Sequence, residues 1–144
     1  MSKQNVDLVR STYAAFARAD IDAVLDAMDP KIDFRVAENS PYYRGSSYVG
    51  REDVRDNIFA RIPVDWDGFE VAPEIYDDAG DVVIMRGRYR GTYRVTGKTM
   101  YAQVAHFWTV RKGKLAEFQQ YIDTAGVREV TGQTAESAAG AISA

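Results

Sequence analysis

The sequence contains no cysteine and a single histidine among its 144 residues. Disulfides, zinc–thiolate sites and thiol nucleophiles are therefore excluded, and imidazole chemistry near neutral pH depends on His106 alone. No apolar run approaches the ~20 residues of a membrane span, and residues 1–10 are too polar for a signal peptide. We therefore expect a cytoplasmic protein with no membrane partner.

The chain also has no excess of positive charge: it contains 18 basic and 21 acidic residues, and its net charge is −3. This balance argues against nucleic acid as a partner. Hydrophobic residues make up 46% and charged residues 27%, as in ordinary folded proteins. A chain of this length fits one domain and buries ~70% of its unfolded surface, which is enough for an internal pocket.

Apolar spacing predicts three helices in the first half of the chain. The first is expected over 5–19, where apolar residues recur every three or four positions: Val6, Val9, Tyr13 and Phe16. Asp20 is the expected N-cap of a second, shorter helix that closes before Pro30. A third helix is expected over 51–62, ending at Pro63.

Alternating patterns predict strands in the remainder. The first is expected over 31–37, and four more are expected over 69–76, 82–95, 100–110 and 115–124. Tight turns join the last four into consecutive hairpins, which favours a mainly antiparallel sheet that wraps around the helices in an α+β domain. We expect the domain to span residues 1–127 and residues 128–144 to form a partly disordered tail.

The last two predicted strands carry a candidate site. Period-two alternation predicts that His106 and Trp108 share a face, and that Tyr121 and Asp123 share a face of the next strand, opposite to Phe107, Phe118 and Ile122. On an apolar face the pKa of Asp123 would rise, which suits a general base with His106 as its partner or a general acid. The alternative is that Asp123 caps a strand end and His106 is a core histidine.

Two arginines and a loop supply further candidates. Arg86 and Arg88 share a strand face. They could bind an anionic substrate if that face is concave, or be solvated or pair with a partner subunit if it is convex. Tyr43 lies in the predicted loop 40–50 and could cover the pocket mouth, or pack under the third helix. Asn39 is a loop candidate whose alternative role is capping.

The sequence resembles a known family along most of its length. The likeness is carried by AHFWTVRKGKL at 105–115 and FQQYIDTA at 118–125, and by Gly50-Arg51-Glu52 at the third helix. These segments resemble the SnoaL-like, ketosteroid-isomerase-related branch of the nuclear transport factor 2-like superfamily. The resemblance implies a conical α+β barrel with three N-terminal helices packed on a curved, mainly antiparallel mixed sheet, an apolar pocket, and a homodimer formed through the outer sheet face.

Limonene-epoxide-hydrolase-like members of the superfamily offer a residue-by-residue comparison. The resemblance places Asp123 at their catalytic base, Asn39 at their loop asparagine and Arg86 at their strand arginine. It departs from them at Ala37, where they have tyrosine, and at Arg88, where they have the acid aspartate. A guanidinium cannot donate that proton.

Two other branches of the superfamily bear on mechanism. Steroid isomerases carry a carboxylate base near the position of Arg35, so their mechanism is not expected here. Polyketide cyclases of the SnoaL type use an aspartate and a histidine, and Asp123 with His106 supplies the same chemical types.

The sequence therefore predicts that the domain binds a small, largely apolar organic molecule and acts on it by acid–base chemistry without a cofactor. Isomerisation, cyclisation, dehydration and hydrolysis remain open. Asp123 and His106 are the expected catalytic residues, and the expected substrate-binding residues are Tyr121, Trp108, Arg86, Arg88, Asn39, Tyr43, Tyr13 and Phe16. No metal is expected, because His106 and Asp123 lack a clear third ligand. The alternative is a non-catalytic binding or dimerisation module.

Overall fold

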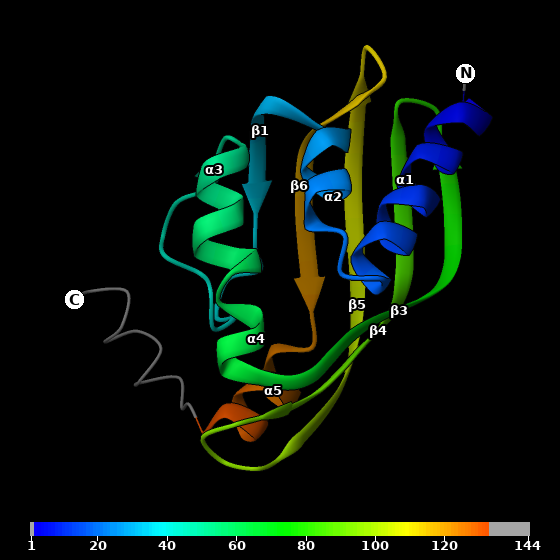
Figure 1. The fold of residues 1–144 in the computed structure, drawn as a ribbon. Coiled ribbons are helices and arrows are strands. Elements are labelled where there is room, and N and C mark those ends of the chain that lie inside the picture. The colour runs from blue at the N-terminus through cyan, green and yellow to red at the C-terminus, as the bar shows by residue number, and fades with distance from the viewer. Residues whose placement is uncertain (1, 133–144) are drawn as a thin grey trace.

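The computed structural model describes residues 2–132 of the chain. Six strands form one curved, mixed sheet in the order β2-β1-β6-β5-β4-β3, and helices cover its inner face (Figure 1). The strands are β1 (Met28–Arg35), β2 (Tyr48–Val49), β3 (Trp66–Ala79), β4 (Val82–Tyr93), β5 (Thr99–Arg111) and β6 (Lys114–Ile122). Within residues 2–132 only β1 and β6 pair in parallel, and the sheet does not close. The predicted α+β class and the consecutive hairpins are confirmed.

The helices are α1 (Ser2–Ala17), α2 (Ile21–Ala27), α3 (Arg51–Val54), the π-helical turn η1 (Arg55–Phe59), α4 (Ile62–Asp65) and α5 (Thr124–Thr131). Both predicted N-terminal helices are confirmed, and the Asp20 side chain caps α2 by accepting from the Ala23 N–H at 3.1 Å. Within residues 2–132 no helix combines the length and the apolar character needed to cross a membrane.

The prediction of one regular third helix is wrong. Residues 51–65 form three short pieces in place of one helix, with the π turn in the middle. Pro63 lies in the first turn of α4, where its missing N–H costs nothing, so it begins a helix where we predicted an end. The wide turn brings both Ile58 and Phe59 toward the sheet, where they line the cavity described below.

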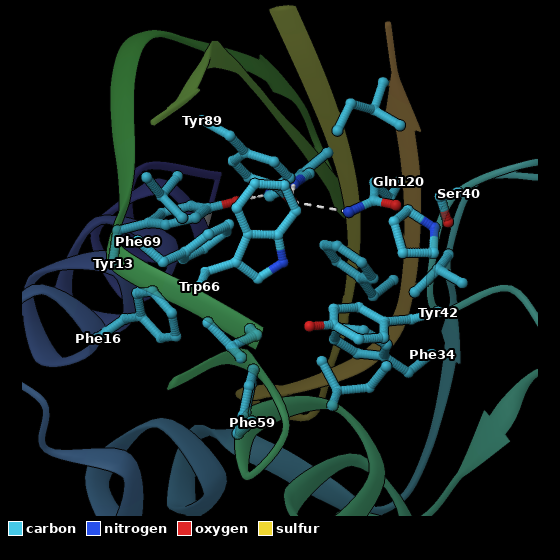
Figure 2. Close-up of a pocket in the computed structure, with 18 of the residues that line it drawn as sticks. Tyr13, Phe16, Phe34, Ser40, Tyr42, Phe59, Trp66, Phe69, Tyr89 and Gln120 are labelled. Atoms are coloured by element: carbon cyan, nitrogen blue, oxygen red, sulfur yellow. Dashed lines mark hydrogen bonds between the residues drawn. The ribbon is translucent and has the colours of Figure 1, made fainter. Parts of the chain in front are cut away.

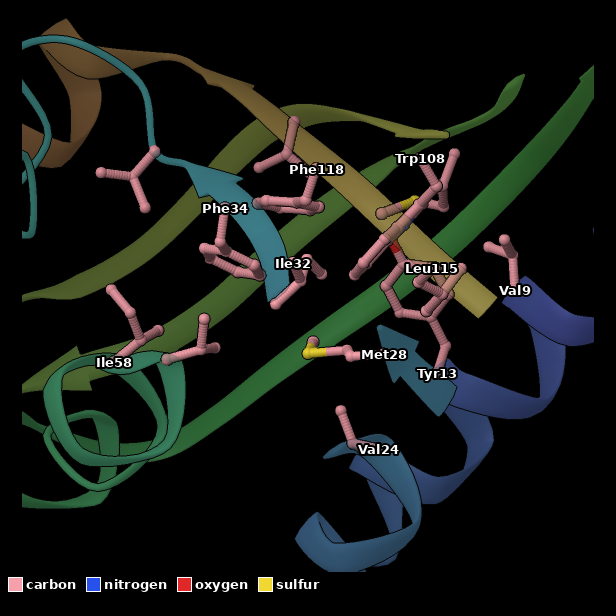
Figure 3. Close-up of a cluster of buried hydrophobic side chains, with 14 of the residues drawn as sticks. Val9, Tyr13, Val24, Met28, Ile32, Phe34, Ile58, Trp108, Leu115 and Phe118 are labelled. Carbon is pink, nitrogen blue, oxygen red and sulfur yellow. The ribbon is translucent and has the colours of Figure 1, made fainter. Parts of the chain in front are cut away.

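A single apolar core lies between the helices and the concave face of the sheet (Figure 3). Side chains from α1, α2, β1, η1, β5 and β6 meet there, including Val9, Val24, Met28, Ile32, Phe34, Ile58, Leu115 and Phe118. The apolar stripe that predicted α1 therefore has its partner in strands that follow much later in the chain.

The register of β5 and β6 decides which residues face this core. His106 pairs with Gln120, and Trp108 pairs with Phe118. Residues directly opposite in an antiparallel pair share a face, so Phe118, Gln120 and Ile122 of β6 point inward. Our assignment of Phe118 and Ile122 to the other face is wrong: alternation groups the residues of a strand but does not say which group faces the helices.

A short helix, α5, follows β6 where the sequence predicted a strand end and then a tail. Asp123 is its N-cap and accepts from the Gly126 N–H at 3.1 Å, and Gly132 ends it in a left-handed conformation with φ of 76°. Val127 is buried and anchors the helix. The predicted tail therefore begins inside a helix, and its residues 133–144 lie outside the described part of the chain.

Close approach of β3 to β4 helps to bend the sheet. Gly87 lies on the inner face of β4, where an added Cβ would be 2.3 Å from the Ala72 carbonyl oxygen. The register of β3 shifts between Pro73 and Ile75, opposite this glycine. Figure 1 shows one end of β3 and β4 sweeping past α4. The bend turns this end of β3 and β4 over the core and carries Tyr89 to the cavity.

Replacing Gly87 should destabilise the fold more than replacing the neighbouring inner-face glycine. We expect Gly87→Ala to lower the free energy of unfolding by about 2–3 kcal/mol, because backbone has to move to make room. Gly91→Ala, whose added Cβ would be 3.3 Å from the Phe69 Cα, should cost about 1 kcal/mol. Urea unfolding of both variants measures the difference, and equal losses would contradict the close approach.

Candidate functional site

An apolar cavity of about 100 Å³ lies between the helices and the concave face of the sheet. Aromatic side chains from α1, β1, η1 and β3 surround it (Figure 2), namely Phe16, Phe34, Phe59, Trp66 and Phe69. Drug-sized ligands occupy pockets of ~300–1,000 Å³, whereas a dry cavity of ~150 Å³ holds benzene. The cavity therefore suits a molecule of about one ring.

His106 lies in the wall of this cavity, 3% exposed, in the middle of β5. The Tyr13 hydroxyl from α1 hydrogen-bonds its Nδ1 at 2.5 Å, and the Tyr89 hydroxyl from β4 hydrogen-bonds its Nε2 at 2.5 Å. Both ring nitrogens are thus engaged by phenols, and all three side chains line the cavity.

Two further side chains complete the hydrogen-bonded set. The Trp108 Nε1–H donates to the Tyr13 oxygen at 2.8 Å, and the Gln120 Nε2–H donates to the Tyr89 oxygen at 2.8 Å. The Gln120 Oε1 accepts from the Ala37 backbone N–H at 3.0 Å. We call Trp108, Tyr13, His106, Tyr89 and Gln120 the buried network.

The buried network carries no charge at neutral pH. Burial lowers the pKa of His106 to about 3, because an imidazolium would be poorly solvated there. Burial likewise raises the pKa of Tyr13 and of Tyr89 well above the ordinary value. The site is a set of neutral donors and acceptors in an apolar wall, which can orient a ligand or move a proton without a resident ion.

Two other polar side chains reach the cavity wall. The Tyr42 hydroxyl donates to Asp65 Oδ2 at 2.9 Å, away from the network. The Ser40 Oγ is buried and finds no hydrogen-bond partner among residues 2–132. Within the same residues, no three His, Asp or Glu side chains come together as a metal site.

Four of the predicted site residues line the cavity: His106, Trp108, Tyr13 and Phe16. Asp123 does not. The prediction that it lies beside His106 is wrong, because Gln120 holds the position opposite His106 and Asp123 is an exposed helix cap. Tyr121 is 57% exposed on the outer face of the sheet, so its expected place in the pocket is also wrong.

Arg86 and Arg88 point away from the cavity. Arg86 pairs with Asp77 at 2.8 Å, and the Arg88 guanidinium lies 4.8 Å from the centre of the Tyr101 ring. Both lie on the convex face, since the alternate residues Met85 and Tyr89 point inward. Arg86 and Arg88 therefore do not line the cavity. Their expected substrate-binding role is wrong for this pocket.

The loop candidates meet in a separate surface depression. Asn39, in the left-handed region with φ of 68°, and Tyr43 line it together with Tyr121, outside the end of β1 and β6. Neither Asn39 nor Tyr43 lines the cavity, which corrects their expected place in the ligand pocket. Val36 and Ile122 line both spaces and form the wall between them.

Sequence reasoning missed Tyr89 and Gln120. A signal for Tyr89 was present, because the buried residues Val83, Met85 and Tyr89 alternate with the arginines of β4. Gln120 carries no such signal. Its role depends on the β5–β6 register and on the Ala37 N–H, which lie far apart in the sequence.

Comparison with known proteins matches this architecture to a described domain. The family model for the SnoaL-like domain matches residues 9–118. The chain belongs to the SnoaL-like domain family. No curated protein matches this SnoaL-like chain.

Solved structures share the fold of this SnoaL-like domain. An NTF2-like protein from Burkholderia thailandensis E264 is 36% identical with a TM-score of 0.83, and the match covers 88% of this chain and 95% of that one. TerC, co-crystallised with polyporic acid, is 25% identical with a TM-score of 0.80, covering 90% and 99%. A hypothetical protein with a ketosteroid isomerase-like fold from Catenulispora acidiphila DSM 44928, in complex with trimethylamine, is 19% identical with a TM-score of 0.75, covering 90% and 95%.

The single histidine should resist protonation in the folded SnoaL-like domain. Its pKa is about 3 when folded and ~6.5 when unfolded, so the unfolded chain binds more protons between these values. The contribution of His106 to stability is complete above pH ~6.5 and falls by up to ~1.4 kcal/mol per unit as pH drops toward the folded pKa. Ring NMR signals should stay constant from pH 8 to 4.5. A midpoint near 6.5 in the folded protein would contradict this burial.

Proposed function

We propose that this SnoaL-like domain binds one small, largely apolar organic molecule in the cavity and acts on it by acid–base chemistry without a cofactor. The observation that carries the proposal is the placement of an uncharged imidazole between two phenols in the wall of an otherwise apolar cavity. Titratable groups with strongly shifted pKa values gather at functional sites more often than elsewhere.

We infer the roles of the three side chains from their hydrogen bonds. Both nitrogens of His106 are occupied by Tyr13 and Tyr89, so a ligand meets a phenol hydroxyl and His106 acts through it. A hydroxyl aimed at a ligand oxygen stabilises negative charge that develops there in enolisation or ring closure. In such a step one phenol gives its proton to the imidazole and takes a proton from the ligand, while the imidazole returns its own proton to the other phenol, whose hydroxyl proton passes to the ligand. This chemistry favours isomerisation or cyclisation.

The relatives support a small molecule as the ligand. TerC was co-crystallised with polyporic acid, and the protein from Catenulispora acidiphila was obtained in complex with trimethylamine. The fold hosts varied chemistry, so the reaction has to be argued from the buried network of this chain.

A non-catalytic binding module is the second candidate. It is favoured by one observation, namely that every nitrogen of His106, Trp108 and Gln120 in the buried network has a partner within the protein. In that case the network keeps the cavity wall rigid and the ligand is held without reaction.

Compounds of one ring should stabilise the protein, and filling the cavity should abolish the effect. A ligand at 100 times its Kd adds ~2.7 kcal/mol to the free energy of unfolding, so Tm rises in a thermal-shift screen. Val71→Phe places a ring in the cavity wall and should remove this rise. The same substitution at the 83% exposed Val95 is the control and should leave it unchanged. The proposal fails if no one-ring compound stabilises the wild type.

We also propose a homodimer formed through the outer face of the sheet. Tyr101 and Phe107 on β5 and Tyr121 on β6 are exposed there, and the rings of Phe107 and Tyr121 lie 5.7 Å apart. Exposed aromatic side chains that gather on one face are typical of an interface.

Light scattering should give twice the 16.1 kDa mass of the chain for the wild type. Phe107→Lys places a charge in the proposed interface and should yield the monomer, whereas Val95→Lys, in the turn after β4, should not. A wild-type monomer at all concentrations would contradict the interface.

A further inference from the structure

The direction of the hydrogen bond at each end of the buried network is known, because each end has a group that can only donate. At one end, the indole of Trp108 can only donate, so the Tyr13 oxygen accepts. At the other end, the Ala37 backbone N–H can only donate, so the facing atom of Gln120 is its oxygen. The amide nitrogen of Gln120 therefore points to Tyr89, and the Tyr89 oxygen accepts as well.

Between these ends there is one hydrogen more than the hydrogen bonds can use. Two bonds join His106 to Tyr13 and Tyr89. The available hydrogens are three, one on each hydroxyl and one on the neutral imidazole. One phenol must therefore donate to the imidazole, and the other must accept from it. The accepting phenol keeps its own hydrogen, for which residues 2–132 offer no hydrogen-bond acceptor.

The tautomer of His106 decides which phenol keeps the spare hydrogen. With the proton on Nδ1, His106 donates to Tyr13, Tyr89 donates to Nε2, and the spare hydrogen is on Tyr13. With the proton on Nε2, the spare hydrogen is on Tyr89. Both phenols line the cavity, so either tautomer places a donor in its wall.

A buried donor without an acceptor is unfavourable, and a ligand in the cavity can supply the acceptor. Its remaining surface has to be apolar, because the wall is lined mainly by aromatic and aliphatic side chains. A charged ligand of either sign would be desolvated without a counter-ion, since no Arg, Lys, Asp or Glu is among the described lining residues.

We propose that the ligand is a neutral one-ring ketone or similar carbonyl compound, whose oxygen accepts the spare hydrogen of Tyr13 or Tyr89, and that His106 adopts the tautomer that supplies it. This inference rests on the proposed function and names its ligand class. The tautomer of His106 thus determines which phenol donates to the carbonyl of the ligand. The spare donor already accepts two hydrogen bonds, which polarises its O–H toward the ligand.

Cyclohexanone and methylenecyclohexane test the proposal, because they have nearly the same shape. Cyclohexanone has a carbonyl oxygen that accepts a hydrogen bond, whereas methylenecyclohexane has a CH₂ group in its place. Their affinities are measured by NMR titration for the wild type, Tyr13→Phe and Tyr89→Phe. Removing the phenol that carries the spare hydrogen should weaken cyclohexanone binding about tenfold and leave the binding of methylenecyclohexane unchanged within about twofold. Removing the other phenol should leave the binding of both compounds unchanged within the same limit.

The tautomer supplies an independent readout. His106 is the single histidine, so ¹⁵N-histidine labelling gives one pair of ring signals that reports which nitrogen is protonated. In the cyclohexanone complex the proton should lie on Nδ1 if Tyr13→Phe is the sensitive variant, and on Nε2 if Tyr89→Phe is. The opposite assignment would overturn the proposal, as would two variants that treat both compounds alike.

The outcomes separate this inference from the proposed function. If both compounds bind and neither variant distinguishes them, the cavity is a ligand site and the spare-hydrogen argument is wrong. If neither compound nor any other one-ring compound binds, the proposed function fails first. Should a variant not fold, the ¹³Cζ signals of Tyr13 and Tyr89 in the wild type replace it. Only the phenol that accepts from His106 should then respond to cyclohexanone and not to methylenecyclohexane.

Discussion

The hydrogen bonds that hold a neutral His106 between Tyr13 and Tyr89 are the constraint on which the site depends. A buried imidazole needs partners for both nitrogens, and here they come from the first helix and from a neighbouring strand. The Tyr13 hydroxyl thereby ties α1 to β5, through His106 and Trp108. The apolar side chains around the cavity then pack against a helix whose position these hydrogen bonds help to set.

The curvature of the sheet brings Tyr89 within reach of His106 and the helices. A flat sheet would hold Tyr89 and Trp66 away from the helices, whereas the bend at Gly87 turns β3 and β4 over the core. The space left between the sheet and the broken third helix is the cavity. Ligand size is therefore a result of backbone geometry as much as of the side chains that line the wall.

Local patterns in the sequence predicted the elements, and long-range pairing decided the site. The stripe of Val9 and Tyr13, the Asp20 cap and the alternating strands are local signals, and the structure contains each of them. The face of β6 that points inward is set by pairing with β5, so alternation placed Asp123 in the pocket when Gln120 belongs there. The short helix α5 was missed because Gly126 weakens its helical signal.

The order in which the chain is synthesised has a bearing on this site. Tyr13 is separated from His106 by 93 residues and from Trp108 by 95, so α1 is synthesised long before the hydrogen-bond partners of Tyr13. Contacts of such separation close late and carry a large entropic cost. Before β5 is made, α1 can pack on β3 and β4, but the hydroxyl of Tyr13 lacks the two partners that it has in the folded protein. In a nascent chain of this protein the buried network therefore forms only after β5 is made, and the binding site is among the last parts to form.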